Sequence, residues 1–333
     1  MTTGSTLQVP PAGQTAAFAS GFGQRVLLTV DTEEEFDWRG PFRREGYGLS
    51  HIEEIPRFQA VCERIGAHPV YLVDWPVVQH ARAVEIIGAA VERGAAEVGI
   101  QLHPWVNPPF EEEVSVHNSF AGNLPRPLEA AKLMALRDAT QAAFGTAPMI
   151  YRAGRYGLGS DTAALLKRAG IRIDTSVRPL FDYSLEGGPD YSNHPLLPYW
   201  LDAEQSLLEV PLTSAYWGLL RRMGSLIHRA KPRLPRFFSG LSRLGLLERI
   251  ALTPEGVSPD EALRGIDLSI EAGLPVLVLS LHSPTLAPGH TPYTTDQAGV
   301  EKLYLWLETV YGRLAARGVT SCTVAEIIAA TGG

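Results

Sequence analysis

Along most of the chain, short apolar runs rich in β-branched residues alternate with longer stretches in which apolar residues recur at helical spacing. The runs predict strands at 25–30, 69–73, 96–102, 148–153, 171–176, 275–281 and 319–324. The longer stretches predict helices that begin near Ser50 and that cover 77–94, 128–144, 161–170, 261–273 and 300–318. Strands that are apolar throughout and separated by helices are typical of a parallel sheet covered by helices.

The chain length, 333 residues, suits a single α/β barrel with insertions. We expect one domain over 25–333, with the strands arranged as a distorted parallel (β/α) barrel. Residues 1–24 are rich in Gly, Pro, Ser and Thr, and we expect them to form a mobile N-terminal tail.

A basic segment interrupts the alternation and predicts a helical insertion around 215–260. From Arg221 to Arg249 it contains eight Lys or Arg residues and a single acidic residue, Glu248. One interpretation is a lid or a docking surface for an anionic partner. The other, which we favour, is an amphipathic insertion whose basic face is solvated.

The overall composition argues against several classes of protein. With 45% hydrophobic and 20% charged residues, the chain is expected to be globular, and its net charge of -7 offers no general attraction to nucleic acid or acidic lipid. Cys62 and Cys322 are too few and too far apart for a disulfide framework or a Cys-x-x-Cys site. No segment resembles an export signal or a membrane span, so we expect a cytoplasmic protein. The oligomeric state is left open.

Polar residues follow the predicted strands at the points where the strands end. They are Asp31, His103, Arg152, Asp174 and His282. In a parallel barrel the loops after the strands share one face, so these side chains are expected to converge. Taken alone, each could be a turn, capping or core residue, and four carboxylates in Asp31–Glu35 could form a solvated acidic turn. The coincidence of all five favours an assembled site.

These residues lie in motifs that resemble the polysaccharide deacetylases, which contain a NodB-homology domain and are also called carbohydrate esterase family four. The motifs, in chain order, are TVDTE, YRAGRYG, IDTSVRP, LLEVPLT and LSLHSP. The resemblance covers roughly Arg25 to Cys322 and implies a barrel of the NodB type. It implies that Asp31 is the general base, that Arg152 holds this base and that His282 is the general acid. Asp174 is then expected to orient His282, although Arg155 competes with Arg152 for its role.

The same resemblance implies a saccharide groove. The motif around Asp174 lines the groove in the family, which makes Ser176 and Pro179 substrate-binding candidates. Trp38, Trp105 and Tyr156 lie near the motifs and are candidates for stacking on sugar faces, although aromatic residues beside Pro and Gly are more often packing anchors.

The resemblance also implies a divalent metal, with zinc as our expectation. Glu33 is the expected acidic ligand, with Glu34 as the alternative, because Thr32 stands where many members have the metal-binding Asp. The second motif normally supplies two histidines, but EVGIQLHPWVN contains only His103. The other imidazole is replaced by Gln101 or by Asn107, depending on the register. An amide oxygen is a harder ligand than imidazole and shifts the preference away from zinc.

The main hypothesis is a metal-dependent hydrolase that removes an acetyl group from an N-acetylated saccharide. The first alternative is a metal-independent hydrolase of a non-sugar C–N bond, which the missing imidazole favours. The second is a non-catalytic carbohydrate-binding descendant of the family. A Ser-His-Asp esterase is disfavoured because the sequence has no Gly-x-Ser-x-Gly motif.

Overall fold

A computed structural model describes residues 7–11, 13–224, 227 and 245–332. Its strands are β1 (Arg25–Thr32), β2 (Pro69–Val73), β3 (Glu97–Leu102), β4 (Ile150–Ala153), β5 (Ile173–Asp174), β6 (Tyr199–Trp200), β7 (Leu208–Glu209), β8 (Ser214–Trp217), β9 (Glu248–Ala251), β10 (Val276–His282) and β11 (Thr320–Ser321). Its α-helices are α1 (Ile55–Ile65), α2 (Trp75–Gln79), α3 (Ala81–Glu92), α4 (Arg126–Phe144), α5 (Thr162–Arg168), α8 (Pro259–Glu271), α9 (Gln297–Ala316) and α10 (Val324–Ala330).

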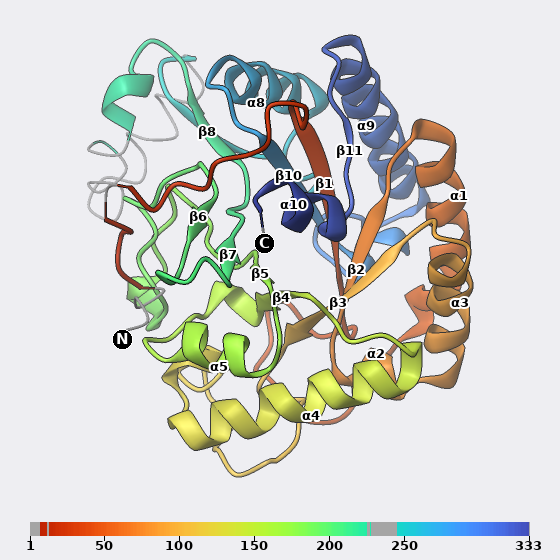
Figure 1. The fold of residues 1–333 in the computed structure, drawn as a ribbon. Coiled ribbons are helices and arrows are strands. Elements are labelled where there is room, and N and C mark those ends of the chain that lie inside the picture. Colours follow the sequence, from red (N-terminus) through yellow and green to blue (C-terminus); the bar gives the residue numbers. More distant parts are fainter. Residues whose placement is uncertain (1–6, 12, 225–226, 228–244, 333) are drawn as a thin grey trace.

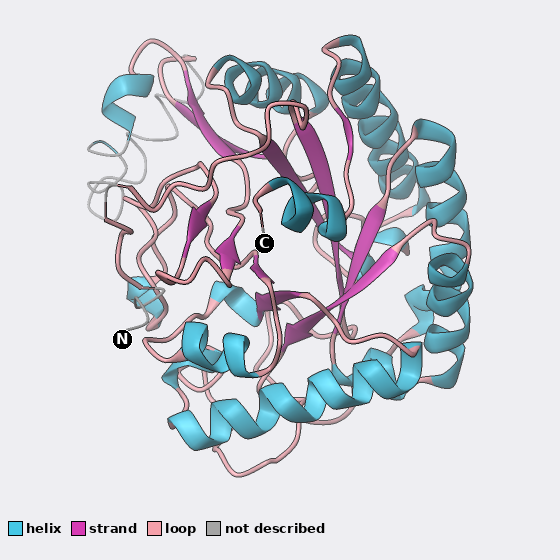
Figure 2. Cartoon of the chain, viewed as in Figure 1, coloured by secondary structure: helices cyan, strands magenta, loops and turns pink. Residues whose placement is uncertain are grey.

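Most strands form one sheet in the order β10-β1-β2-β3-β4-β5-β7-β6, with β11 beside the start of β1. Every pair in it is parallel except β6 with β7. Figure 1 shows α8, α9, α1, α3 and α4 following one another around the outside of the curled sheet. In Figure 2, loops cover the side that carries β6 and β7. The predicted fold class, an α/β distorted parallel barrel, is confirmed.

The barrel is closed irregularly between β7 and β10. After β7 the chain continues to Thr213, whose hydroxyl accepts a hydrogen bond from the Val278 amide at 2.9 Å. The Ser280 amide donates to the carbonyl of Leu252 at 3.1 Å. These contacts supply part of the pairing that a further strand would give, because each satisfies a backbone amide of β10.

Alternate residues of the strands point to opposite sides of the sheet. Inside the barrel, Leu27 and Leu72 share an apolar cluster with Val324 and Ile327 of α10. The intervening residues, such as Leu28, face the surrounding helices. Since the side-chain period of a strand is two, Thr29 and Asp31 point inward like Leu27. The interior is therefore apolar toward α10 and becomes polar toward the carboxyl ends of the strands.

Several boundaries differ from the prediction. The predicted helix 77–94 is divided into α2 and α3 at His80, which is extended and whose ring accepts a hydrogen bond from the Ala83 amide at 3.3 Å. The predicted strand 171–176 is reduced to β5. The predicted tail contacts the barrel at Gln14, whose carbonyl accepts a hydrogen bond from the Trp200 amide at 2.8 Å.

Of the predicted helical insertion around 215–260, residues 225–226 and 228–244 lie outside the described residues. Its described part contains β8 and β9, which pair as an antiparallel ribbon. Among the described residues, no helix is both long enough and apolar enough to cross a membrane.

Candidate active site

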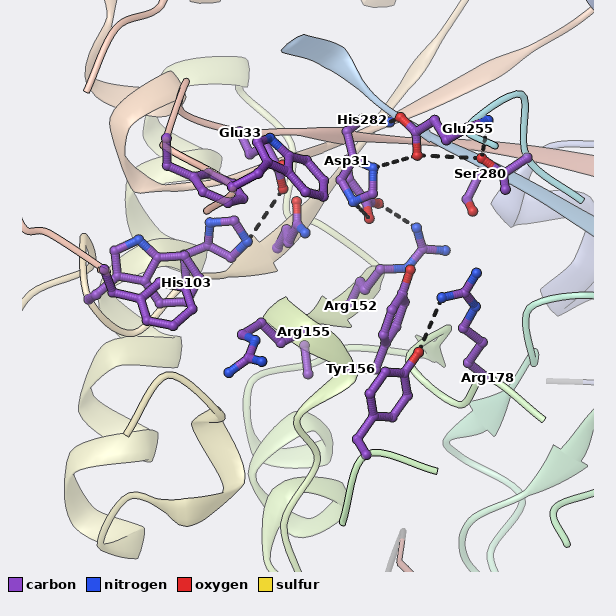
Figure 3. Close-up of a pocket in the computed structure, with 18 of the residues that line it drawn as sticks. Asp31, Glu33, His103, Arg152, Arg155, Tyr156, Arg178, Glu255, Ser280 and His282 are labelled. Carbon is purple, nitrogen blue, oxygen red and sulfur yellow. Dashed lines mark hydrogen bonds and ion pairs between the residues drawn. The ribbon is translucent and has the colours of Figure 1, made fainter. Parts of the chain in front are cut away.

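A cavity of about 490 Å³ lies where the carboxyl ends of β1, β3, β4 and β10 meet. Its lining includes six of the predicted catalytic and metal-binding residues, namely Asp31, Glu33, Gln101, His103, Arg152 and His282. In the strand ladders, Asp31 is the partner of His282, and Gln101 is the partner of Arg152. Figure 3 shows side chains from these separate strands pointing into one space.

Asp31 and Arg152 form a buried ion pair. The Arg152 guanidinium donates through Nη1 to Oδ1 of Asp31, and both side chains are excluded from solvent. Its Nε donates to the Thr175 carbonyl at 3.0 Å, and its Nη2 donates to the Thr29 hydroxyl at 2.9 Å. These contacts fix a permanent positive charge beside the carboxylate of Asp31. The remaining oxygen, Oδ2, lies 3.7 Å from Nε2 of His282.

His282 is held by a residue that sequence reasoning missed, Glu255. The Nδ1 atom of His282 lies 2.7 Å from Oε2 of Glu255, and the His282 amide donates to Oε1 at 2.8 Å. Burial lowers the pKa of His282, but the carboxylates of Glu255, Glu33 and Asp31 outweigh it and raise the pKa to about 10. Burial alone would raise the pKa of Glu255, but the adjacent imidazolium lowers it below its usual range. His282 is therefore protonated at neutral pH.

Glu33 faces His103 across the other side of the cavity. Its Oε2 lies 3.4 Å from Nε2 of His103. Burial raises the pKa of Glu33 to about 8, with His282 and His103 acting in the opposite direction. Among the described residues, its buried Oε1 has no hydrogen-bond partner.

Three residues behind His103 orient its ring. Nδ1 of His103 lies 2.9 Å from Oε2 of Glu34, and Nε1 of Trp105 donates to the other Glu34 oxygen at 2.7 Å. The Glu34 amide donates to Asp74 at 2.9 Å. Since a carboxylate accepts the proton on Nδ1, Nε2 of His103 is left as the acceptor that faces the cavity.

A divalent cation fits the residues at this end of the cavity. Glu34, Asp74 and His103 have possible ligand atoms within 4.8 Å of one another, but the oxygens of Glu34 and Asp74 are already hydrogen-bonded to protein groups. The free donors lie on the cavity side, at Nε2 of His103, the carboxylate of Glu33 and the amide oxygen of Gln101. Within the described part of the chain, buried Oε1 of Gln101 also has no partner. A buried oxygen without a partner is costly unless it has a ligand, and one nitrogen with two oxygens is a reasonable metal set.

Asn107, the alternative to Gln101, is directed away from the cavity. Its amide nitrogen donates to the carbonyls of Pro108 at 2.7 Å and Lys132 at 3.0 Å, and the residue is not part of the cavity lining. Gln101 lies on β3, with the same inward direction as Arg152 on β4, its register partner. The structure therefore favours Gln101 over Asn107.

Asp174 does not contact His282, and the expected contact is a wrong prediction. Asp174 points to the outer face of the sheet, where its Oδ1 accepts hydrogen bonds from the amide and hydroxyl of Ser176. It lies opposite Glu209 in the ladder between β5 and β7. The physical reason is strand alternation, because Ile173 faces the interior and its neighbour must face outward.

Ser176 and Pro179 are likewise absent from the cavity lining. Both are buried, and the Ser176 hydroxyl also accepts a hydrogen bond from the Ala153 amide at 2.8 Å. Arg178, between them in the same motif, does line the cavity. The residue of this motif that lines the cavity is therefore Arg178, which was not selected from the sequence.

The three predicted aromatic residues all line the cavity. The Trp38 ring meets the His282 ring edge-on, with centroids 5.0 Å apart. The Trp105 ring stacks on His103, with centroids 4.3 Å apart, so it also orients a polar residue of the site. Tyr156 lies at the end of the cavity near Arg178, whose guanidinium carbon is 5.2 Å from its ring centroid.

The turn after β4 holds the chain close to the site. Arg155 and Tyr156 adopt left-handed backbone conformations, with φ of 53° and 60°, each at a cost of roughly 1 kcal/mol. Gly154 precedes them, and a Cβ at that position would lie only 2.4 Å from Cδ2 of His103. Arg155 pairs with Glu186 rather than with Asp31. The turn therefore needs glycine to admit His103, and Arg152 alone holds Asp31.

Comparisons with known proteins give likenesses of fold. Neither a family model nor a curated protein sequence matches the chain. A putative polysaccharide deacetylase from Mycobacterium smegmatis aligns with TM-score 0.48 and 16% identity, over 95% of this chain and 98% of that one. A family 4 carbohydrate esterase from Streptomyces lividans aligns with TM-score 0.44 and 11% identity, over 91% of this chain and 94% of that one. At these TM-scores the two likenesses establish neither family nor activity.

The 4-alpha-glucanotransferase from Thermococcus litoralis aligns more closely in space. Its TM-score is 0.54 at 10% identity, over 92% of this chain and 40% of that one. That alignment shows a shared fold and carries nothing about the reaction. The chemistry of this protein is therefore argued from its own side chains.

The sequence gives little indication that Glu255 belongs to the site. It follows the apolar run Ile250–Leu252 as Asp31 follows its own strand, but β9 lies in the small ribbon outside the main sheet. Nothing in the spacing indicates that the loop after β9 passes next to β10. The contact between Glu255 and His282 is a product of tertiary structure.

Proposed function

We propose that this protein is a hydrolase that removes an acetyl group from an N-acetylated saccharide, with Asp31 as general base and His282 as general acid. One observation carries the proposal. The carboxylate of Asp31, fixed by Arg152, lies 3.7 Å from a His282 that Glu255 keeps protonated, and both line one cavity with Glu33 and His103. A paired base and acid are what amide hydrolysis requires, since water must lose a proton and the amine must gain one.

In this mechanism Asp31 accepts a proton from a water molecule as the water oxygen attacks the acetyl carbonyl carbon. His282 donates its Nε2 proton to the amide nitrogen as the C–N bond breaks, which yields acetate and a free amine. The proton on Asp31 can then return to His282 across the 3.7 Å that separates Oδ2 from Nε2. Arg152 keeps Asp31 in position throughout, because it is anchored by Thr29 and Thr175 as well.

Glu33, His103 and Gln101 are the residues that would hold the divalent metal. A bound cation would supply Lewis-acid polarisation of the acetyl carbonyl and charge stabilisation as the oxyanion develops. Glu34 and Trp105 keep Nε2 of His103 directed at the cavity. The identity of the metal, zinc included, and the cytoplasmic location stay predictions from the sequence.

A specific observation favours a second candidate. Gln101 stands where the resemblance implies an imidazole, and its Oε1 is a weaker metal ligand. A metal-independent hydrolase of another C–N bond would use the same Asp31 and His282, with Gln101 as a polar contact to the substrate amide. A binding module without catalysis is less consistent with the site, because such a module has no need of a paired base and acid.

The test combines metal content and product release. Purified, unchelated protein is analysed for metals, and acetate release is measured from N-acetylated oligosaccharides with and without added Zn²⁺, Mn²⁺ or Co²⁺. We expect metal near one equivalent and metal-stimulated acetate release, both lost in Glu33→Gln and His103→Ala. His117→Ala is the matched control, since His117 is exposed and outside the cavity.

The outcomes separate the candidates. Acetate release that is insensitive to chelation would move the assignment to the metal-independent mechanism. Stoichiometric metal with no acetate from any saccharide would reject the deacetylase and leave a metal site of another purpose. The absence of both metal and acetate would reject the proposal outright.

A further inference from the structure

We propose that the substrate carries an oxyanion group, a carboxylate or a phosphate, and that Arg178 binds this group at the end of the cavity remote from His103. The inference rests on the proposed function, because it specifies the substrate of the same site.

The other cationic side chains of the cavity wall each have a carboxylate partner. Arg152 pairs with Asp31, Arg155 pairs with Glu186, and His282 pairs with Glu255. Arg178 lines the same cavity, and no carboxylate of the described residues lies within ion-pair distance, 4.0 Å, of its guanidinium. Its charge is therefore uncompensated by the described protein.

Aromatic side chains hold Arg178 in place. Its guanidinium carbon lies 3.9 Å from the centroid of the Phe181 ring and 5.2 Å from that of Tyr156. Its Nη1 donates to the Tyr183 hydroxyl at 3.2 Å. In Figure 3, Arg178 lies beyond Arg152 as seen from His103, with Tyr156 between the two arginines. These contacts fix the direction of the guanidinium but leave donor capacity unused, since a guanidinium has five N–H groups. Within the described chain its buried Nε has no partner.

A second cation reinforces the positive potential. Arg249 covers the Phe181 ring at 3.6 Å, and its Nη1 donates to the Leu180 carbonyl at 2.8 Å. Arg178 and Arg249 therefore both contact one aromatic ring, and no carboxylate of the described chain lies within ion-pair distance of either. Two like charges so placed repel each other, and a bound anion would relieve this repulsion.

Arginine is suited to this task because its planar fork matches carboxylate and phosphate geometry. A neutral sugar hydroxyl would gain little from a fixed guanidinium, whereas an oxyanion in a partly desolvated cavity gains a charge-assisted pair. Carboxylate and phosphate share this chemistry, and the probes below distinguish them.

The test is calorimetric binding of three probes to the whole protein: N-acetylglucosamine, N-acetylglucosamine 6-phosphate and N-acetylmuramic acid. We expect at least one charged probe to bind about tenfold more tightly than the neutral sugar, and the preferred probe identifies phosphate or carboxylate. Raising NaCl from about 50 mM to about 500 mM is expected to reduce the preference in the unmodified protein. Arg178→Gln is expected to bring all three affinities within about twofold, and Arg178→Lys to retain part of the preference.

Arg57→Gln is the matched control. Arg57 also lies over a tyrosine, 4.4 Å from the Tyr304 centroid, but it belongs to α1 and does not line the cavity. It should retain the preference. Equal affinities for all probes in the unmodified protein, including no binding of any, would overturn the inference. So would an Arg178→Gln variant that loses neutral and charged probes alike, because Arg178 would then be only a packing residue.

Acetate release from the same probes separates this inference from the proposed function. A salt-sensitive preference for a charged probe, with no acetate from any probe, would support the anion site and reject deacetylation. Acetate from all three probes at equal kcat/KM, with equal affinities, would support deacetylation and reject the anion site.

Discussion

Two groups of buried carboxylates occupy opposite faces of the same sheet and meet opposite surroundings. Inside the barrel, Asp31 contacts the guanidinium of Arg152. On the outer face, Asp174 lies opposite a second carboxyl group, Glu209, in the ladder of β5 and β7. Burial raises the pKa of Asp174 to about 6. Burial also raises the pKa of Glu209 well above its usual range, and the neighbouring carboxyl of Asp174 raises it further.

The difference shows that a buried carboxylate needs a cation beside it if it is to stay ionised and act as a base. Both groups are excluded from solvent, but among the described residues only the inward one is in contact with cations, Arg152 and the protonated His282. A carboxyl that faces another carboxyl shares or retains a proton, because two like charges cannot both ionise at close range. The surroundings of the outer pair therefore favour a shared or retained proton, whereas Asp31 has the cationic partners that its proposed role as base requires.

Among the substitutions considered, Asp31→Asn should have the greatest effect on activity, because it makes the inward position neutral like the outer one. We expect acetate release to fall by about 10²–10⁴-fold, since an amide cannot accept the proton. The melting temperature should also fall, because Arg152 stays buried and loses its counter-charge.

Asp37→Asn is the control for this substitution. Asp37 lines the same cavity but is exposed, and among the described residues its side chain accepts a hydrogen bond only from the nearby Arg39 amide, at 2.9 Å. Its activity and melting temperature should stay close to those of the unmodified protein. An Asp31→Asn protein with more than about a tenth of the original activity would exclude Asp31 as the base.

Glu255→Gln weakens the positive charge on His282, one of the two cationic partners of Asp31. Glu255 is the carboxylate that contributes most to raising the pKa of His282 to about 10. The general acid works only while protonated, so activity is lost as the pH rises through this pKa. In the variant, the alkaline limb of kcat/KM should move to lower pH by about one unit or more, which lowers activity at pH 9 by about twofold or more and leaves activity at pH 6 almost unchanged.

Glu186→Gln provides the matched measurement for that shift. It removes a cavity carboxylate that pairs with Arg155 rather than with His282. Its alkaline limb should stay where it is. An unmoved limb in Glu255→Gln would show that His282 does not set it.

The contrast between the two faces also explains which parts of the site could be predicted. The strand-end positions of Asp31, His103, Arg152 and His282 followed from the alternation of strands and helices, because parallel strands end at one face. The direction of Asp174 could not be predicted in the same way. Ile173 and Asp174 point to opposite faces, but both faces of this strand are buried, so the sequence does not show which of the two residues points into the barrel.

Other parts of the site depend on loops, for which the sequence has no periodic signal. Glu255 reaches His282 from the loop after β9, and Tyr183 reaches Arg178 from the loop after β5. Gln101 and Asn107 were equally good candidates by spacing. The tertiary structure separates them, because Gln101 lines the cavity beside Arg152 whereas the Asn107 amide donates to the carbonyls of Pro108 and Lys132. The alternation of strands and helices and the broad fold were therefore predictable, whereas the partners of the proposed catalytic residues required the tertiary structure.

Glu209→Gln tests the outer pair of carboxyls, because it should change only the pH dependence of the free energy of unfolding. A folded-state pKa above the unfolded value means that the folded protein keeps a proton that the unfolded chain has released. The stability from such a group is fully present below its unfolded pKa and is lost as the pH rises through the folded pKa. Asp174 loses its contribution between about pH 4 and pH 6, and Glu209 loses its own from about pH 4 up to a higher pH, because its folded-state pKa is raised further.

Glutamine reproduces the neutral form of Glu209 at every pH and can still accept the hydrogen bond that the Val177 amide donates to Oε1 at 3.1 Å. The variant should therefore match the unmodified protein at about pH 4 and be more stable by about 1 kcal/mol or more at pH 8, as measured by urea unfolding across this range. Glu271→Gln, at an exposed position on α8, should leave the pH dependence unchanged. If Glu209→Gln were instead less stable at pH 8, Glu209 would have to be ionised in the folded protein, and the two faces of the sheet would not differ as the comparison requires.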